Sequence, residues 1–119
     1  MKVLIVDDDA AMREVLLIVT EEWGFQARTA GDGVEGAHLA ESWDPDIVIS
    51  DVVMPGWSGV DLCDRLTEAH PELKVLYMSG YTDDRLVHEG VLNPGTALLQ
   101  KPFTPLTLAR KVREVLVEQ

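Results

Sequence analysis

The sequence predicts an α/β fold in which helices cover both faces of a parallel sheet, and two observations support this prediction. Five short apolar runs, most of them rich in β-branched residues, recur along the 119 residues, and stretches with helical spacing of apolar residues separate them. Strands that alternate with helices indicate a parallel, doubly wound sheet with right-handed crossovers. We therefore expect one domain that covers residues 1–119.

The apolar runs are the expected strands, at residues 3–6, 26–30, 47–50, 75–78 and 97–100. Two helices are expected from apolar residues that recur every three or four positions. The first set is Met12, Val15, Leu16, Val19 and Trp23, and the second is Leu108, Ala109, Val112, Val115 and Leu116.

Local signals mark where several elements begin and end. Ser58 with Asp61 three residues later resembles a capping box at the start of a helix, and His70 followed by proline closes that helix. Thr104 before Pro105 fits a cap and a first helical residue. The residues 93–95, Asn-Pro-Gly, predict a turn.

Chemically capable residues follow four of the five expected strands. Three aspartates, Asp7, Asp8 and Asp9, come after the first strand, whereas the second ends in what reads as a simple turn, Gly31-Asp32-Gly33. The third strand leads to Asp51, the fourth to Ser79 and Gly80, and the fifth to Lys101 and Pro102. Ligands of such sheets bind beyond the carboxyl ends of the strands. We therefore expect carboxylates, one hydroxyl and one ammonium to meet there.

Converging carboxylates repel one another unless a cation lies between them. Hard oxygen ligands suit Mg²⁺, which keeps several waters and shares its shell with phosphate oxygens. Each residue also has a simpler interpretation, because Asp9 or a neighbour could cap the first helix and Asp51 could form a turn. The histidines His38, His70 and His88 lack the spacing of zinc ligands.

Composition excludes several classes of function. A formal charge of −11 disfavours direct binding to nucleic acid, and no apolar run is long enough to cross or insert into a membrane. No signal peptide is recognisable. The single cysteine, Cys63, fits a small buried side chain in a reducing compartment, so we expect a cytoplasmic protein.

Four blocks together resemble the signature of response-regulator receiver domains of two-component systems. They are VLIVDDD at 3–9, DIVISDVVMPGWSG at 46–59, KVLYMSGYTDD at 74–84 and LLQKPFTP at 98–105. The resemblance implies a flavodoxin-like (βα)5 fold, a doubly wound five-stranded parallel sheet in the strand order 2-1-3-4-5.

The resemblance also implies a role for each site residue. Asp51 is the expected phosphoacceptor, Ser79 the hydroxyl that bonds the phosphoryl group, and Lys101 the lysine that pairs with it. Mg²⁺ is expected on Asp8 directly, on Asp7 through water, on Asp51 and on the main-chain carbonyl of Val53. The Lys101–Pro102 bond is expected to be cis.

The resemblance implies a phosphohistidine donor on a histidine kinase or a histidine phosphotransfer protein. It further implies a monomer or weak dimer that is not an enzyme, apart from catalysing its own phosphorylation and dephosphorylation. A docking module with an unused phosphosite is an alternative. An aspartyl-phosphate phosphatase would need a second aspartate where Val53 stands, and an FMN protein would need a phosphate-binding loop where three aspartates stand.

Two features depart from the resemblance. Leu98 occupies a position where the family usually carries an aromatic residue. In the family, that aromatic ring moves inward when the phosphoryl group is engaged, and leucine has no ring to move. The second half is most similar to receivers of hybrid histidine kinases, and the first half to those of transcriptional regulators. A free-standing regulator, an excised domain and a chimera all remain open.

Overall fold

The five strands form a single parallel sheet in the order β2-β1-β3-β4-β5. The computed structural model describes residues 1–81 and 83–117. The strands are β1 (Lys2–Val6), β2 (Gln26–Ala30), β3 (Ile47–Asp51), β4 (Lys74–Ser79) and β5 (Leu98–Gln100). Both the predicted strand positions and the predicted strand order are confirmed.

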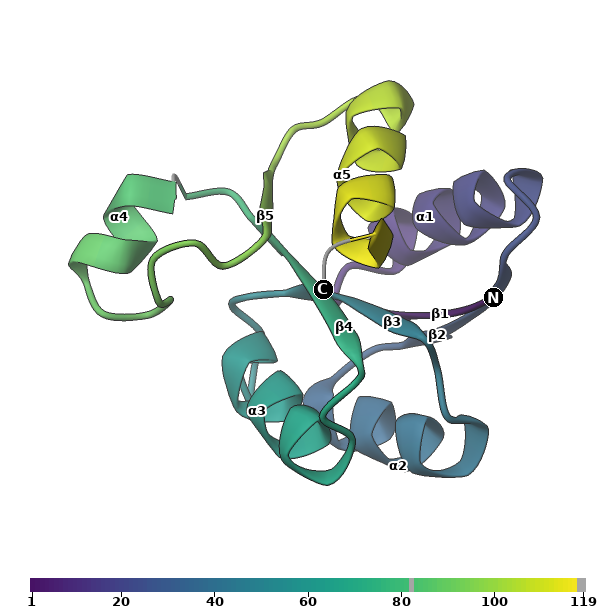
Figure 1. The fold of residues 1–119 in the computed structure, drawn as a ribbon, viewed down its shortest axis with the longest axis horizontal. Helices are drawn as coiled ribbons and strands as arrows, with labels where there is room; N and C mark the ends of the chain where they lie inside the picture. The colour runs from purple at the N-terminus through teal and green to yellow at the C-terminus, as the bar shows by residue number, and fades with distance from the viewer. Residues whose placement is uncertain (82, 118–119) are drawn as a thin grey trace.

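Helices cover both faces of this sheet. They are α1 (Ala10–Glu22), α2 (Gly33–Trp43), α3 (Gly59–Ala69), α4 (Asp83–His88) and α5 (Pro105–Val117). Helices α1 and α5 lie on one face and α2 and α3 on the other, while α4 lies beyond the β5 edge (Figure 1). The doubly wound architecture is therefore confirmed. Within the described residues, no helix combines the length and apolarity needed to span a membrane.

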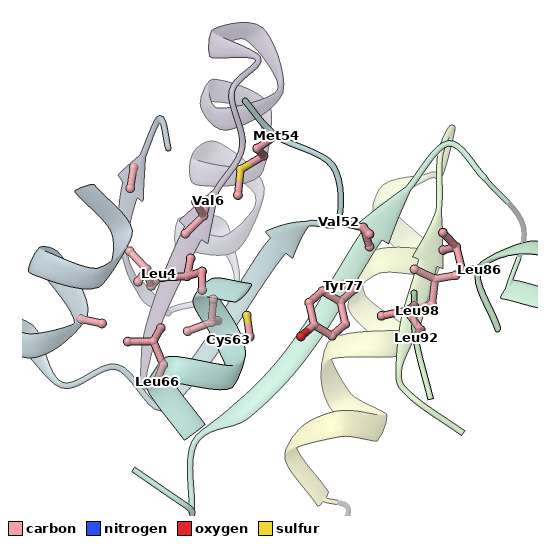
Figure 2. Close-up of a cluster of buried hydrophobic side chains, with 14 residues drawn as sticks. Leu4, Val6, Val52, Met54, Cys63, Leu66, Tyr77, Leu86, Leu92 and Leu98 are labelled. Carbon is pink, nitrogen blue, oxygen red and sulfur yellow. The ribbon is translucent and has the colours of Figure 1, made fainter. Parts of the chain in front are cut away.

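Each strand of the sheet centre supplies both cores, because successive side chains of a strand point to opposite faces. Leu4 and Val6 join one cluster with Leu62 of α3, and Figure 2 shows this cluster. Val3 and Ile5 join the other cluster with side chains from α1 and α5. Full burial of one such side chain contributes about 1.5–3 kcal/mol. These two layers fix the sheet, and the sheet fixes the loops at its ends.

The predicted helix boundaries are confirmed. The Ser58 hydroxyl accepts the Asp61 amide at 3.1 Å, and the Asp61 carboxylate accepts the Ser58 amide in return. At the start of α5, the Thr104 hydroxyl accepts the Thr107 amide at 3.1 Å. Helix α3 ends at Ala69, directly before the His-Pro pair.

The apolar stripe predicted for α1 is partly wrong. Leu16 is buried, but Val15 is 53% exposed and Trp23 lies at the C-cap, beyond the helix. The buried residue that the spacing did not reveal is Thr20, whose hydroxyl donates to the Leu16 carbonyl at 2.7 Å. A threonine can replace an apolar side chain there because its hydroxyl is satisfied within the helix.

Cys63 is a buried small side chain, as predicted. It lies on α3 beside Tyr77 of β4, and burial raises the pKa of its thiol to about 12. The thiolate that would react with electrophiles or bind metal is therefore scarce at neutral pH. This residue serves the core and not the candidate site.

Candidate functional site

The carboxyl ends of the strands bring the predicted site residues to one edge of the sheet. Asp7 and Asp8 follow β1, and Asp51 is the last residue of β3. One carboxylate oxygen from each of these three aspartates lies within 4.8 Å of the others. The predicted convergence of carboxylates is confirmed.

Asp7 is held by a hydrogen bond at every polar group. Its amide donates to the Ala30 carbonyl at 3.2 Å, and its own carbonyl accepts Nη1 of Arg13 at 2.7 Å. One carboxylate oxygen accepts the Asp9 amide at 2.9 Å, and the other accepts Nζ of Lys101 at 3.0 Å. Since Asp7 is fully buried, these bonds compensate the cost of removing its carboxylate from water.

The three consecutive aspartates have three different environments. Asp8 is exposed, and its carboxylate faces the same small space as those of Asp7 and Asp51. Asp9 caps α1, because its side chain accepts the amides of Ala11 at 2.9 Å and Met12 at 3.4 Å. The capping role that the sequence left open among these residues therefore belongs to Asp9.

Lys101 forms ion pairs with both the buried Asp7 and the partly exposed Asp51. Its Nζ lies 3.0 Å from Oδ2 of Asp7 and 3.3 Å from Oδ2 of Asp51. Burial alone would lower the pKa of Lys101, but the hydrogen bond that its ammonium donates to Asp7 and the charge of Asp51 outweigh that effect and raise the pKa. The ammonium is therefore charged across the physiological pH range.

The carboxyl of Asp51 has a raised pKa. Burial is the largest cause, and the charge of Asp7 adds to it, while Lys101 and the Val53 amide act in the opposite direction. Three carboxylates meet at this site, whereas Lys101 brings one positive charge to it. The charge balance of the site leaves it attractive to a cation.

Ser79 ends β4 next to Asp51, since the register pairs Asp51 with Met78. Its side chain is buried, and its hydroxyl oxygen accepts the Tyr81 amide at 2.9 Å. That bond uses the oxygen as an acceptor and leaves the hydroxyl hydrogen to donate. The Ser79 carbonyl accepts the Lys101 amide at 2.7 Å, and the Lys101–Pro102 bond is cis, as expected.

Gly59 packs against the main chain of Asp51, a contact that the sequence did not predict. A Cβ at this position would collide with the main-chain oxygen of Asp51 and would lie 2.8 Å from Oγ of Ser50. Only a residue without a side chain allows α3 to approach the end of β3 this closely. The sequence places Gly59 directly after the Ser58 cap, but a glycine at such a position can also belong to a turn. The close contact with Asp51 could therefore not be inferred from the sequence.

Two exposed side chains lie close in sequence to candidate site residues. Val53 follows Asp51 by two residues and is 60% exposed, and Tyr81 follows Ser79 by two residues and is 45% exposed. The guanidinium of Arg85 lies over the Tyr81 ring at 4.4 Å. Neither Val53 nor Tyr81 offers a carboxylate or an imidazole that could activate water.

The donor set suits a hard divalent cation. Three carboxylates meet, one of them with a pKa raised partly by its acidic neighbour. Oxygen-only ligands are those that Mg²⁺ and Ca²⁺ prefer, and softer metals select sulfur or imidazole. Among the described residues, no other group of acids, histidines or cysteines converges in this way.

Comparisons with known proteins identify the family of the chain. The family described as "Response regulator receiver domain" matches residues 3–113. The DNA-binding response regulator MtrA of Mycobacterium tuberculosis is 33% identical over 112 residues, which cover 94% of this chain and 49% of MtrA. The chain thus spans about half the length of that relative.

Two further relatives come from different signalling proteins. The sensor kinase CckA of Brucella abortus is 34% identical over 119 residues, which cover 98% of this chain and 13% of CckA. The crystal structure of the chemotaxis protein CheY4 of Vibrio cholerae superposes with a TM-score of 0.85 at 32% identity, covering 97% of this chain and 98% of CheY4. The chain belongs to the response regulator receiver domains, the phospho-accepting modules of two-component signalling.

Proposed function

We propose that Asp51 is the residue that accepts the phosphoryl group. The observation that carries this proposal is the position of its carboxylate, partly exposed, within reach of Lys101 and beside Asp7 and Asp8. Asp7 is fully enclosed and Asp9 caps a helix, so neither is free to attack an incoming phosphorus. Asp51 combines access with a neighbouring positive charge.

The reaction that fits this site is a direct transfer between two protein side chains. A carboxylate oxygen of Asp51 forms a bond to phosphorus while the phosphorus–nitrogen bond of a phosphohistidine breaks, and the electron pair returns to the imidazole. The product is an acyl phosphate on Asp51. The chain supplies positioning and charge, which are the main protein contributions to phosphoryl transfer.

Lys101 and Ser79 are the proposed partners of the transferred group. The Lys101 ammonium already lies 3.3 Å from Asp51, so it can pair with a phosphoryl oxygen there. The Ser79 hydroxyl can donate its hydrogen to a second oxygen, because its acceptor position is filled by the Tyr81 amide. Both groups would stabilise the negative charge on the oxygens of the phosphoryl group.

We propose Mg²⁺ as the cation, held by Asp8 and Asp51, by Asp7 through water and by the main-chain carbonyl of Val53. Three converging carboxylates fit this ion, and they meet one ammonium, that of Lys101, among the ion pairs of the described residues. A bound Mg²⁺ would supply positive charge to the oxygens of the phosphoryl group.

The proposed donor is a phosphohistidine on a histidine kinase or a phosphotransfer protein. We propose that residues 1–119 act as one receiver unit, as a monomer or weak dimer, in a reducing cytoplasm that suits the free thiol of Cys63. We also propose that the chain does not act as an enzyme on other molecules. Val53 lies two residues after Asp51, and its side chain provides no acid or base for hydrolysing a substrate.

Intact mass spectrometry tests the acceptor directly. After incubation with Mg²⁺ and acetyl phosphate, the wild type should gain about 80 Da, the mass of one phosphoryl group. Asp51→Asn should abolish this adduct, and Asp64→Asn, which alters an exposed acid on α3, should retain it. A full-stoichiometry adduct on Asp51→Asn would overturn the assignment.

A further inference from the structure

Arg13 connects α1 to the buried aspartate of the site, Asp7, by a side-chain hydrogen bond. Its Nη1 donates to the main-chain oxygen of Asp7 at 2.7 Å in a partly buried position. The connection between β1 and α1 consists of only three residues, Asp7 to Asp9. A bond from the first turns of α1 to the start of this connection therefore restrains its whole path.

Arg13 also lies against the neighbouring loop between β2 and α2. A Cβ added at Gly31 would lie 3.3 Å from Nη1 of Arg13, closer than most real contacts. The Gly31 amide in turn donates to the Glu35 carboxylate at 3.3 Å. The guanidinium thus fills the space between two loops, and the missing side chain at Gly31 leaves room for it.

We propose that Arg13 is a positioning residue for the divalent-cation site, and that Gly31 is glycine because Arg13 needs this space. This inference rests on the proposed function, since it assumes a cation between Asp8 and Asp51. By holding the Asp7 carbonyl, Arg13 fixes the direction in which Asp8, the next residue, projects. The arginine touches neither the cation nor the phosphoryl group.

The sign of the effect separates positioning from charge. Arg13 carries a positive charge near the cation site, so its removal should strengthen cation binding if charge were its main influence. A positioning role predicts the opposite, because a loosened Asp8 coordinates less well. Groups that orient metal ligands typically contribute about 10–100-fold in affinity.

The experiment is calorimetric titration of MgCl2 into the unphosphorylated protein. Arg13→Met keeps the length of the aliphatic stem and removes the donor and the charge, and we expect it to weaken Mg²⁺ binding about tenfold. Gly31→Ala should cause a smaller loss in the wild type and none in the Arg13→Met background, because the alanine then has no guanidinium to displace. Mg²⁺ affinity that is unchanged or tighter in Arg13→Met, or equal losses from Gly31→Ala in both backgrounds, would overturn the proposal.

Two controls make the outcome specific. Urea unfolding in EDTA measures the folding stability of each variant, so a merely structural role would lower stability without changing the Mg²⁺ affinity of the folded fraction. Asp8→Asn reports on the cation site itself. If Asp8→Asn binds Mg²⁺ as well as the wild type, the proposed site is wrong; if only Arg13→Met does, the site stands and the inference about Arg13 fails.

Discussion

At the scale of single residues, three consecutive aspartates take different tasks because their surroundings differ. Asp7 is enclosed and fully hydrogen-bonded, Asp8 is exposed beside Asp51, and Asp9 caps α1. Residue type alone does not distinguish them. Burial and the direction of the chain decide which carboxylate can bind a cation and which one supports the backbone.

The residues Val53 and Tyr81 should slow hydrolysis of the phosphorylated protein. Both are bulky, exposed and unable to act as a general base near neutral pH. Gly80 leaves open space, since no atom of the described residues lies within 4 Å of a Cβ placed there, but we expect the bulk of Tyr81 to outweigh it. Val53→Asn and Tyr81→Ala should therefore lose the phosphoryl group about 3–10-fold faster, below the ~10²–10⁴-fold that general-base catalysis provides.

Decay can be followed by intact mass in Mg²⁺ buffer after removal of the phosphodonor. Val117→Asn is a suitable control, because Val117 is 73% exposed at the far end of α5. Shielding by these two side chains is the wrong explanation if neither variant decays faster than the wild type and the control.

At the scale of elements, the end of β3 depends on the start of α3. Gly59 is the first residue of α3 and packs against Asp51. Its amide donates to the Val52 carbonyl at 2.9 Å. The start of the helix is therefore hydrogen-bonded to the residue that follows the proposed acceptor, Asp51. Rigid support of this kind keeps a reacting side chain in position.

Gly59→Ala should destabilise the protein, because the new methyl group collides with the main-chain oxygen of Asp51. Overpacking of this kind typically costs about 1–3 kcal/mol. Gly80→Ala is the matched control, since a Cβ there meets no atom within 4 Å in the part of the chain that the structure describes, and we expect a much smaller change. Urea unfolding compares the two, and equal stability of both variants would contradict the role given to Gly59.

Leu98 on β5 should confine the response to phosphorylation. The side chain is buried among Tyr77, Leu86 and Leu92, and it has neither a ring to rearrange nor a hydroxyl to expose. A covalent mark shifts a conformational equilibrium only through different interactions with the two states. Amide chemical-shift changes on phosphorylation should therefore stay close to Asp51, Ser79 and Lys101.

Two-dimensional NMR before and after phosphorylation makes this measurable. Leu98→Tyr is the informative comparison, and we expect it to extend the changes along α5. Large changes across residues 107–116 in the wild type would show that another element transmits the signal.

At the scale of the whole molecule, cation binding and folding are linked. The chain carries a formal charge of −11, and three of its acids meet at one edge of the sheet. Burial raises the pKa of Asp51 above its ordinary value in the folded state. At pH values between the ordinary pKa and the raised one, folding without metal takes up a proton on Asp51. The free energy of unfolding therefore falls as the pH rises through that range.

Asp51→Asn should consequently stabilise the metal-free protein at neutral pH. The gain should fall within about 0.5–2 kcal/mol, the usual range of stabilising substitutions, and Asp8→Asn should act in the same direction. Urea unfolding in EDTA from pH 4 to pH 8 should show the difference from wild type growing as the pH rises. Unchanged or lower stability in both variants would contradict electrostatic strain at this site.

Mg²⁺ should reverse the order of stability. A ligand that binds only the folded state contributes about 2.7 kcal/mol at a hundredfold excess over its dissociation constant. The wild type should gain more than Asp51→Asn, and an equal ionic strength of NaCl serves as the control.

Sequence patterns predicted the parallel sheet and the meeting of Asp7, Asp8 and Asp51, because strand ends are visible as the points where apolar runs stop. The strand order was predicted from the resemblance to receiver domains. They did not predict the burial of Thr20 or the exposure of Val15, since helical spacing does not say how wide a face is covered. Arg13 was also missed. A charged residue on an amphipathic helix looks solvated until the loop that it contacts is known.

Turn residues were equally ambiguous. The residues 31–33 read as a simple turn, yet Asp32 caps α2 by accepting the Glu35 amide at 2.8 Å. Such bonds depend on backbone angles that composition does not determine. The structure was needed to assign them.

The ion pair between Asp7 and Lys101 joins residues separated by 94 positions. A ribosome must therefore synthesise almost the entire domain before the pair can form, and closing so long a loop carries an entropic cost that earlier contacts have to offset. Partly made or partly folded chains contain Asp51 but lack the ammonium beside it. We therefore expect a chain that ends before Lys101 to accept a phosphoryl group less readily than one that contains it.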